Sequence, residues 1–434
     1  MKRVLGLVMG EYGMVAVLGA LCVLFSVLTW REQPVEGGGG GAALARDVVA
    51  EFGDEGVRVL VVSRKGGDDG AFVAAFERGV GASKVEVLRV VSGTPRDAKL
   101  AVEELDPEVV ACPPGVAAWP VFSGVAEKVR TTRAGYGASF LKAENLLNIA
   151  SQISVIAILA IGMTMVIITA GIDLSVGSLI ALSAVVTTWL IQRWGGESAG
   201  MGMMLVACLG GVLVCGCAGL FTGTMVSRFT MPPFIVTLGM MLMARGLSYT
   251  IAGGETIYRV PDGFTWLGRA ALVGGIPVSV VLMVLLYAVA HVLMGHTALG
   301  RYVYAVGGNA EAARLSGVAV KRIKLMVYTV CGALAGLGGV VMASQLKSGS
   351  GTYGQMYELY VIAAVVVGGT SLFGGKGKII GTLIGAFIIA VIRNGMNLLN
   401  MNEFTQNIVL GGVILVAVLL ERLKSGEWRS EVGG

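Results

Sequence analysis

The sequence predicts an all-α polytopic membrane protein of about ten transmembrane helices, with a small α/β extracytoplasmic insertion between the first two. Apolar residues make up 55% of the 434 residues, charged residues only 14%, and the mean hydropathy is +0.78. A soluble domain has about 25% charged residues, so this chain has too few charges to cover a globular surface in water. Its 66 glycines fit membrane helices, which pack closely through small residues.

The charges are concentrated in one segment near the N-terminus. Residues 31–143 hold 14 of the 33 basic and 16 of the 28 acidic residues. The apolar run before Arg31 is long enough to span a membrane and lacks a small-x-small cleavage site, which favours a helix over a cleaved signal. The predicted divisions are a first transmembrane helix over 1–30, an extracytoplasmic α/β insertion with a glycine-rich linker over 31–143, a membrane-embedded core over 144–424 and a cytoplasmic tail over 425–434.

Hydropathy predicts ten spanning segments. The eighth has only 14 residues, so it is either tilted or broken against its neighbours. Ten spans with both termini in the cytoplasm put most basic loop residues inside, which agrees with the positive-inside rule. The predicted spans are 12–30, 151–170, 174–192, 202–227, 233–252, 277–295, 325–344, 359–372, 379–397 and 404–420.

The hydrophilic segment has the pattern of an α/β module. Five glycines, Gly37–Gly41, predict a flexible linker. Strand and helix patterns then alternate, which predicts βαβ units and a parallel sheet. The turn over 63–70 follows the first strand, where such sheets bind ligands, but an ordinary polar turn explains it equally well. The predicted helices are 42–52, 69–79 and 95–105, and the predicted strands are 57–62, 85–91 and 108–111.

Four polar residues of the core are candidates for a translocation pathway. Asp173 and Ser175 lie between two apolar runs, and a charge at membrane depth is costly and usually functional. The alternative is that Asp173 caps the helix that follows it. Asn394 and Asn397 share one helix face, and they either line a polar pathway or form hydrogen bonds between packed helices.

A short helix is predicted in the loop 296–324. Asn309 is a favourable N-cap, Glu311 lies in the first turn, and Gly317 ends the helical segment. So short a helix is unstable alone and must rest on a partner's groove or on its own chain.

No pattern in the chain predicts catalytic, metal or cofactor chemistry. The six cysteines lack the spacing of a zinc site, and the glycine-rich segment 366–378 departs from a phosphate-binding loop. The net charge of +5 divides into +7 for the membrane body (19 basic and 12 acidic residues) and −2 for the insertion. This distribution gives no reason to expect binding to nucleic acid.

The chain resembles the permease subunit of ribose-type bacterial ABC importers. The similarity runs from about Asn145 to Lys424 and rests on long motifs in the family's order. These motifs are Gly171–Ser178 (GIDLSVGS), Pro232–Gly239 (PPFIVTLG), Gly300–Gly317 (GRYVYAVGGNAEAARLSG) and Ile362–Gly375 (IAAVVVGGTSLFGG).

The resemblance implies a transport permease, not an enzyme, that moves a monosaccharide such as ribose, xylose or galactose across the bacterial inner membrane by alternating access. The same machinery for a branched-chain amino acid, a nucleoside or a furanose signal is the alternative. The implied partners, besides the lipid bilayer, are a cytoplasmic ATP-binding subunit that hydrolyses ATP, a periplasmic sugar-binding protein and a second permease subunit in a homodimer. The implied coupling helix, on which the ATP-binding subunit docks, comprises Asn309, Glu311, Ala312, Arg314, Leu315 and Gly317.

Two features depart from the family pattern. The family usually has an aspartate where this chain has Tyr360, which affects the polarity of the pore and the identity of the substrate. Most relatives have only a short loop in place of the insertion, whose strand–helix order looks like part of a sugar-binding-protein lobe, with Phe76–Gly79 on its first helix. The insertion is either a tethered module that contacts the binding protein or substrate, or a lineage-specific decoration.

Overall fold

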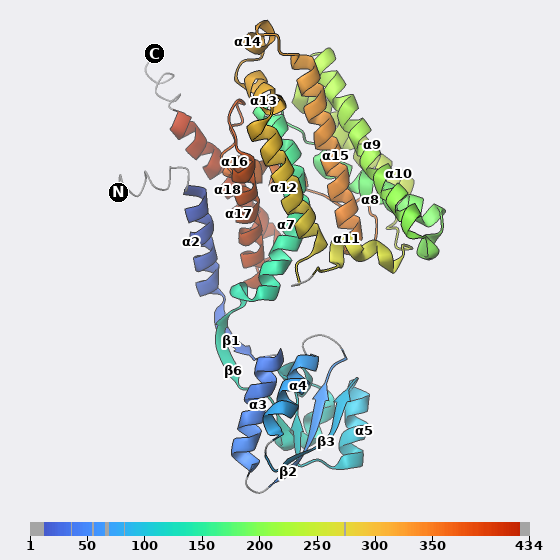
Figure 1. Ribbon diagram of the computed structural model, residues 1–434, viewed down its shortest axis with the longest axis vertical. Helices are drawn as coiled ribbons and strands as arrows, with labels where there is room; N and C mark the ends of the chain where they lie inside the picture. Colours follow the sequence, from blue (N-terminus) through green and yellow to red (C-terminus); the bar gives the residue numbers. More distant parts are fainter. Residues whose placement is uncertain are drawn as a thin grey trace. The chain divides into compact units, whose positions relative to one another are not determined.

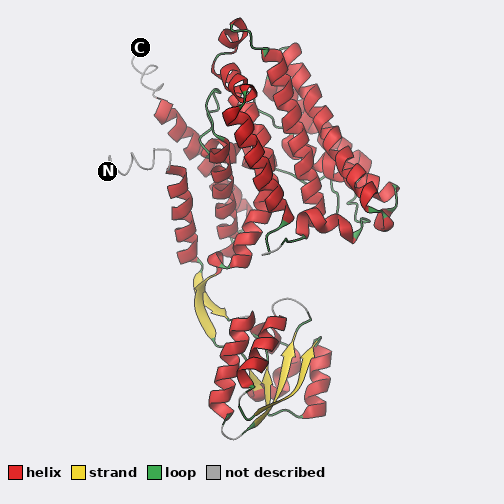
Figure 2. Cartoon of the chain, in the orientation of Figure 1, coloured by secondary structure: helices red, strands yellow, loops and turns green. Residues whose placement is uncertain are grey.

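The computed structural model describes residues 13–35, 37–53, 56–65, 69–81, 83–272 and 275–425 (Figures 1 and 2). The chain divides into two compact units. We call residues 29–139 the sheet unit, and the described residues before and after it the helical unit. The N-terminal basic residues and the tail over 426–434, which entered the orientation argument, lie outside the described residues.

The helical unit is a bundle of apolar helices. Among the described residues, seven helices are long and apolar enough to cross a membrane. Three shorter apolar helices accompany them: α2 (Gly13–Leu28), α16 (Tyr357–Val367) and residues Glu403–Leu419 of α18 (Glu403–Ser425). The seven are α7 (Ala143–Ile168), α8 (Val176–Arg193), α9 (Met201–Arg228), α10 (Pro233–Ala252), α12 (Val278–His296), α15 (Val320–Leu346) and α17 (Ile379–Leu398).

Short elements connect these helices at the two ends of the bundle. In Figure 1, α14 lies at one end, and α11 lies at the other, beside the C-terminal end of α15. The Ser344 hydroxyl of α15 accepts a hydrogen bond of 2.8 Å from the Gly268 amide of α11. The short elements are η2 (Ser139–Leu141), η3 (Gly196–Ser198), η4 (Asp262–Thr265), α11 (Trp266–Arg269), α13 (Ala298–Gly308) and α14 (Ala310–Leu315).

At the expected eighth span, 359–372, the structure has the helix α16, which is shorter than the apolar segment that predicted the span. α16 has 11 residues, and at 1.5 Å per residue it covers about half of a bilayer's hydrocarbon core. The chain over 348–356 forms a bridge and turns instead of a helix, and irregular backbone at membrane depth needs polar partners inside the protein. Arg245 of α10 supplies them, because its Nη1 donates to the carbonyls of Gly351 at 2.6 Å and Tyr353 at 2.8 Å.

Glycines allow α9 and α15 to touch along their backbones. A Cβ atom on Gly219 would lie 2.3 Å from the carbonyl oxygen of Tyr328, and one on Gly332 would lie 2.4 Å from that of Cys215. Real Cβ atoms do not approach so closely, so only glycine permits this contact. The small residues recur every four positions, at Gly211, Cys215, Gly219 and Gly223, which is the spacing typical of close membrane-helix pairs.

The sheet unit contains a four-stranded parallel sheet between two layers of helices. Its strand order is β3-β2-β4-β5. Val59 and Val61 of β2 belong to the core formed with α3 and α4, whereas Leu60 and Val62 belong to the core on the other face, with α5. The elements are α3 (Gly37–Phe52), β2 (Val57–Ser63), α4 (Asp69–Val80), β3 (Val85–Ser92), α5 (Pro95–Leu105), β4 (Val109–Ala111), α6 (Pro114–Ala117), η1 (Pro120–Lys128) and β5 (Val129–Arg130).

The expectation of a flexible linker at Gly37–Gly41 is wrong, because these residues form the first turns of α3. A Cβ atom on Gly41 would lie 2.0 Å from the carbonyl oxygen of Phe72, so glycine lets α3 lie directly against α4. Leu44 and Val48 of α3 join Phe72 in one buried core. Burial of these side chains therefore outweighs the conformational freedom that glycine has in an isolated chain.

The sheet unit begins and ends in one two-stranded ribbon. β1 (Trp30–Pro34) pairs antiparallel with β6 (Ala134–Ala138), so that Trp30 lies opposite Ala138. The chain therefore enters and leaves this unit at the same place, which explains how about a hundred residues fit between α2 and α7.

We expect Gly219→Ala to destabilise the helical unit by about 1–3 kcal/mol, because the new methyl group would force the α9 and α15 backbones apart. Gly216→Ala is the matched control on the same helix, since its Cβ atom would lie 3.7 Å from the Ala333 side chain, an ordinary contact. Thermal unfolding of both variants in detergent measures the difference. Equal stability of the two variants would contradict the backbone contact.

Candidate functional site

The helix α14 begins with the predicted cap. Asn309 Oδ1 accepts hydrogen bonds from the amides of Glu311 at 3.0 Å and Ala312 at 2.9 Å. Arg314 donates to both carboxylate oxygens of Glu311, at 2.5 and 3.0 Å. These hydrogen bonds lower the pKa of Glu311, so the pair is fully ionised at neutral pH. α14 therefore presents a fixed pair of opposite charges to its surroundings.

The rest of α14 also has the features of a contact surface. The Leu315 side chain is 76% exposed and lies next to the ion pair of Glu311 with Arg314. Ala313 faces inward and is buried. Gly317 follows with a φ of +84°, a conformation that favours glycine and turns the chain into α15. α14 thus exposes one large apolar side chain beside an ion pair.

The base of α14 is held against the end of α7. A Cβ atom on Gly307 of α13 would lie 1.6 Å from the carbonyl oxygen of Ile168, the last residue of α7. That oxygen also accepts a 2.9 Å hydrogen bond from the amide of Gly375. Tyr304 of α13 donates to the carbonyl of Gly377 at 2.8 Å. A force on α14 would therefore reach α7 and the loop between α16 and α17 directly.

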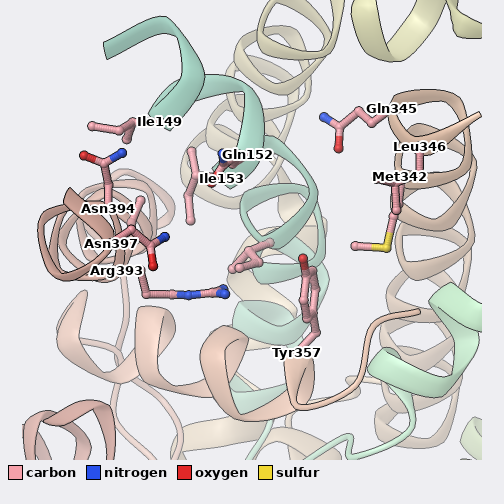
Figure 3. Close-up of a pocket in the computed structure, with 12 residues that line it drawn as sticks. Ile149, Gln152, Ile153, Met342, Gln345, Leu346, Tyr357, Arg393, Asn394 and Asn397 are labelled. Atoms are coloured by element: carbon pink, nitrogen blue, oxygen red, sulfur yellow. The ribbon is translucent and has the colours of Figure 1, made fainter. Parts of the chain in front are cut away.

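A cavity of about 300 Å³ lies between α7, α15, α16 and α17 (Figure 3). α15 begins at Val320, close after α14, and its last two residues line the cavity, so the cavity lies at the other end of the bundle from α14. Its volume is at the lower limit of small-molecule sites, which suits a small solute. The lining residues are Ile149, Gln152, Ile153, Ile156, Met342, Gln345, Leu346, Tyr357, Ala390, Arg393, Asn394 and Asn397.

Both asparagines that the sequence singled out line this cavity. Asn394 exchanges two hydrogen bonds with Asn145 of α7, at 2.8 and 3.0 Å, so its amide also joins two helices. The Asn397 Oδ1 accepts a 2.7 Å hydrogen bond from Gln406, which leaves its amide nitrogen as a potential donor. Asn394 thus forms the hydrogen bonds between packed helices that were one of its two expected roles, and it also lines the cavity. Its role in a translocation pathway stays a prediction.

Arg393 is the charged residue of the cavity wall, and the sequence analysis missed it. Its guanidinium carbon lies 4.6 Å from the centre of the Tyr360 ring, in cation–π geometry. In Figure 3 its side chain extends from α17 toward Tyr357, the first residue of α16. The sequence did contain a signal for Arg393, which is a basic residue inside the ninth predicted span, 379–397. Such residues usually face the interior of a bundle or a cavity.

Asp173 and Ser175 lie outside the cavity, buried between α7 and α8. The Asp173 Oδ1 accepts from the Ser175 amide at 2.9 Å and from its hydroxyl at 2.6 Å. Ser175, not Asp173, is the N-cap residue of α8, so the proposed capping role of Asp173 is wrong. The carboxylate instead closes a local turn one step before the helix.

The helical unit has the architecture of a multi-pass membrane protein, with a small cavity at one end of the bundle and an exposed short helix at the other. A family model described as "Branched-chain amino acid transport system / permease component" matches residues 145–418. The chain belongs to this family, which makes it a transport subunit rather than an enzyme. The sheet unit precedes the matched residues. No solved structure matches the chain.

Curated relatives are sugar import permeases. The chain is 44% identical over 291 residues to the ribose import permease protein of Escherichia coli, covering 66% of this chain and 88% of that protein. It is 39% identical over 286 residues to the D-allose transport system permease protein of the same species, with 66% and 86% covered. It is 37% identical over 298 residues to the fructose import permease protein of Rhizobium meliloti, with 66% and 80% covered.

We expect Asn394→Leu to destabilise the helical unit by about 1–3 kcal/mol, because the Asn145 Oδ1 loses its donor, whereas the Asn145 Nδ2 keeps the Phe140 carbonyl as acceptor. The double variant Asn145→Leu with Asn394→Leu should be less destabilised than the sum of the two single variants, since no orphaned amide remains. Unfolding of the unsubstituted chain, the two single variants and the double variant in detergent measures the coupling energy between Asn145 and Asn394. Additive effects would show that the two amides are not coupled.

Proposed function

We propose that the chain is the membrane-spanning permease of an ATP-driven importer that moves a monosaccharide of the ribose, xylose or galactose type across the bacterial inner membrane. The observation that carries this proposal is the 44% identity to a ribose import permease over 88% of its length. Allose and fructose permeases among the relatives point to the same class of solute. The cavity supports it, because amides on apolar walls are suited to a small polyhydroxylated ring.

We infer ten membrane passes, made by the seven long helices together with α2, α16 and α18. In this topology the irregular segment 347–356 and α16 make one pass between them. The loops on the α14 side carry most of the basic residues, so that side is cytoplasmic by the positive-inside rule. The cavity then opens toward the periplasm, and both termini lie in the cytoplasm.

Transport by alternating access needs partners that this chain does not contain. We propose that α14 is a coupling helix on which a cytoplasmic ATP-binding subunit docks through Asn309, Glu311, Arg314 and Leu315. ATP is hydrolysed on that subunit, and its movement passes from α14 to α7 through the contact of Gly307 with Ile168. A periplasmic sugar-binding protein delivers the solute, and a second copy of the permease completes the path in the bilayer.

The second candidate keeps this machinery and changes the solute to a branched-chain amino acid, a nucleoside or a furanose signal. The family description names branched-chain amino acids, which keeps this candidate open. Uptake by proteoliposomes that contain the chain with its cognate partners separates the two. ATP-dependent uptake of ribose, xylose or galactose, with none of leucine or adenosine, is the result expected.

In the same proteoliposomes Arg314→Glu should lower uptake about ten-fold or more, because the reversed charge faces the partner and repels Glu311. ATP hydrolysis should persist but lose its stimulation by the loaded binding protein. Arg193→Glu is the matched control, since this exposed arginine ends α8 at the other end of the bundle. Normal uptake by Arg314→Glu, or ATP hydrolysis that the loaded binding protein still stimulates in this variant, would rule out docking at α14.

We further propose that the sheet unit lies in the periplasm, as a tethered module that contacts the binding protein or the solute. A parallel sheet with helices on both faces binds ligands where its strand order reverses, at the carboxyl ends of neighbouring strands. Here the order reverses between β2 and β4, where the Arg64 guanidinium packs 3.2 Å from the Cβ position of Gly115. The alternative is a decoration that transport does not need.

Replacement of residues 35–133 by Asn-Gly tests this role. It would join β1 to β6 by a two-residue turn that favours a hairpin, so the ribbon and the helical unit should persist. We expect lower uptake at limiting concentrations of binding protein, measured in proteoliposomes with the full-length chain as reference. If uptake and the affinity for the binding protein are both unchanged, the sheet unit is a decoration that transport does not need.

A further inference from the structure

We infer that the cavity binds a monosaccharide that carries an anionic group, a sugar acid, and that Arg393 holds this group. This inference rests on the proposed importer function and narrows its substrate class. Neither the family match nor the named relatives assign a charge preference or a role to Arg393.

The charge of Arg393 lacks a protein counter-charge. In the described part of the chain no carboxylate forms an ion pair with its guanidinium. The cavity lining contains no aspartate or glutamate, and its other wall residues are apolar or neutral. A basic residue inside an apolar membrane helix usually faces the bundle interior or a cavity and has a functional partner there. The solute is the partner that the cavity admits.

The acid in the first turn of α16 is directed elsewhere. Glu358 follows Tyr357 on α16, but its Oε2 lies against α8, 2.2 Å from the Cβ position of Gly177. There its electrostatic neighbour is Arg245, not Arg393. A tyrosine ring, that of Tyr360, lies beside the guanidinium of Arg393. Among the residues that line the cavity, Arg393 is therefore the one with a charge.

Tyr357 of α16 accepts a hydrogen bond from the guanidinium of Arg393, and the other N–H groups of that guanidinium remain available to a ligand. Tyr360 covers one face of the planar guanidinium, and stacking of this kind uses the face but not the N–H groups in the plane. Those groups match the two oxygens of a carboxylate in a bidentate pair. α16 begins at Tyr357 in the cavity wall, so the positive end of its dipole adds to the potential there.

The remaining wall suits the sugar ring. Gln152, Gln345 and Asn397 offer amide groups to hydroxyls, whereas Ile153 and Met342 offer apolar surface to the carbon skeleton. Gln345 is held in place because its amide nitrogen donates to the Ser151 carbonyl at 3.0 Å, which leaves its oxygen to accept. A single charged side chain surrounded by neutral amides is suited to a sugar that carries one acid group.

Binding to the purified full-length chain in lipid nanodiscs tests the inference. The probes are D-galactose and D-galacturonate, and D-ribose and D-ribonate, pairs that differ in the acid group, with acetate as an anion that lacks the ring. We expect each acid to bind about ten-fold more tightly than its neutral partner, measured by calorimetry or saturation-transfer NMR in 50 mM salt. Acetate should bind far more weakly than either acid.

Variants separate charge recognition from a structural role. Arg393→Gln and Tyr360→Asp should both remove the preference for the acid while neutral sugars still bind, because one deletes the cation and the other neutralises it. Tyr360→Phe keeps the stacked ring and should keep the preference. Arg193→Gln removes a cation at the exposed end of α8 and should change nothing.

The outcomes distinguish this inference from the function it rests on. Equal binding of acid and neutral sugar, or a preference that survives Arg393→Gln, would overturn the inference and leave the sugar importer intact. Acetate binding as tightly as the sugar acids would also overturn it, since the site would then recognise any anion. Binding of L-leucine in place of every sugar and sugar acid would overturn the proposed function itself.

Discussion

Direct contact between helix backbones, permitted by glycine, is the constraint on which the helical unit depends. Membrane helices gain nothing from hiding apolar side chains from one another, because lipid is equally apolar, so they associate through close packing. The α16–α17 pair shows the consequence for the site. A Cβ atom on Gly385 would lie 2.0 Å from the Ala364 carbonyl, and one on Gly381 would lie 2.3 Å from that of Gly368. This contact brings Arg393 over the ring of Tyr360.

Two breaks in the helices place the functional groups at opposite ends of one bundle. At one end the chain leaves α13, turns at Asn309 and forms α14, whose base rests on the end of α7. At the other end the irregular segment before α16 is held by Arg245, and α16 starts in the cavity wall. α7 and α15 run between these ends, because each contributes residues to the cavity and contacts at the α14 end. α7 and α15 therefore connect the α14 end of the bundle with the cavity.

Local patterns predicted local structure well. The capping hydrogen bonds of Asn309 were predictable because a cap depends on three neighbouring residues. The strand expected over 57–62 spans Val57–Ser63, since β-branched residues between turns have few alternatives. The same reasoning failed where a distant segment decides. Gly37–Gly41 become helical only because α4 lies against them, and Asp173 closes a turn in place of the cap its position favoured.

The sequence by itself determined the membrane class, the order of the apolar segments, the side on which basic loops gather and the position of the short helix after Asn309. These properties follow from composition and from interactions between near neighbours. Only the tertiary structure decided that Arg393, Tyr357, Gln152 and Gln345 share one cavity, and that Asp173 lies outside it. Four helices far apart in the chain form that cavity, and no local pattern specifies which of their faces meet. Each glycine contact that decides which faces meet joins two helices. It can therefore be identified only in the folded structure, where both helices are present.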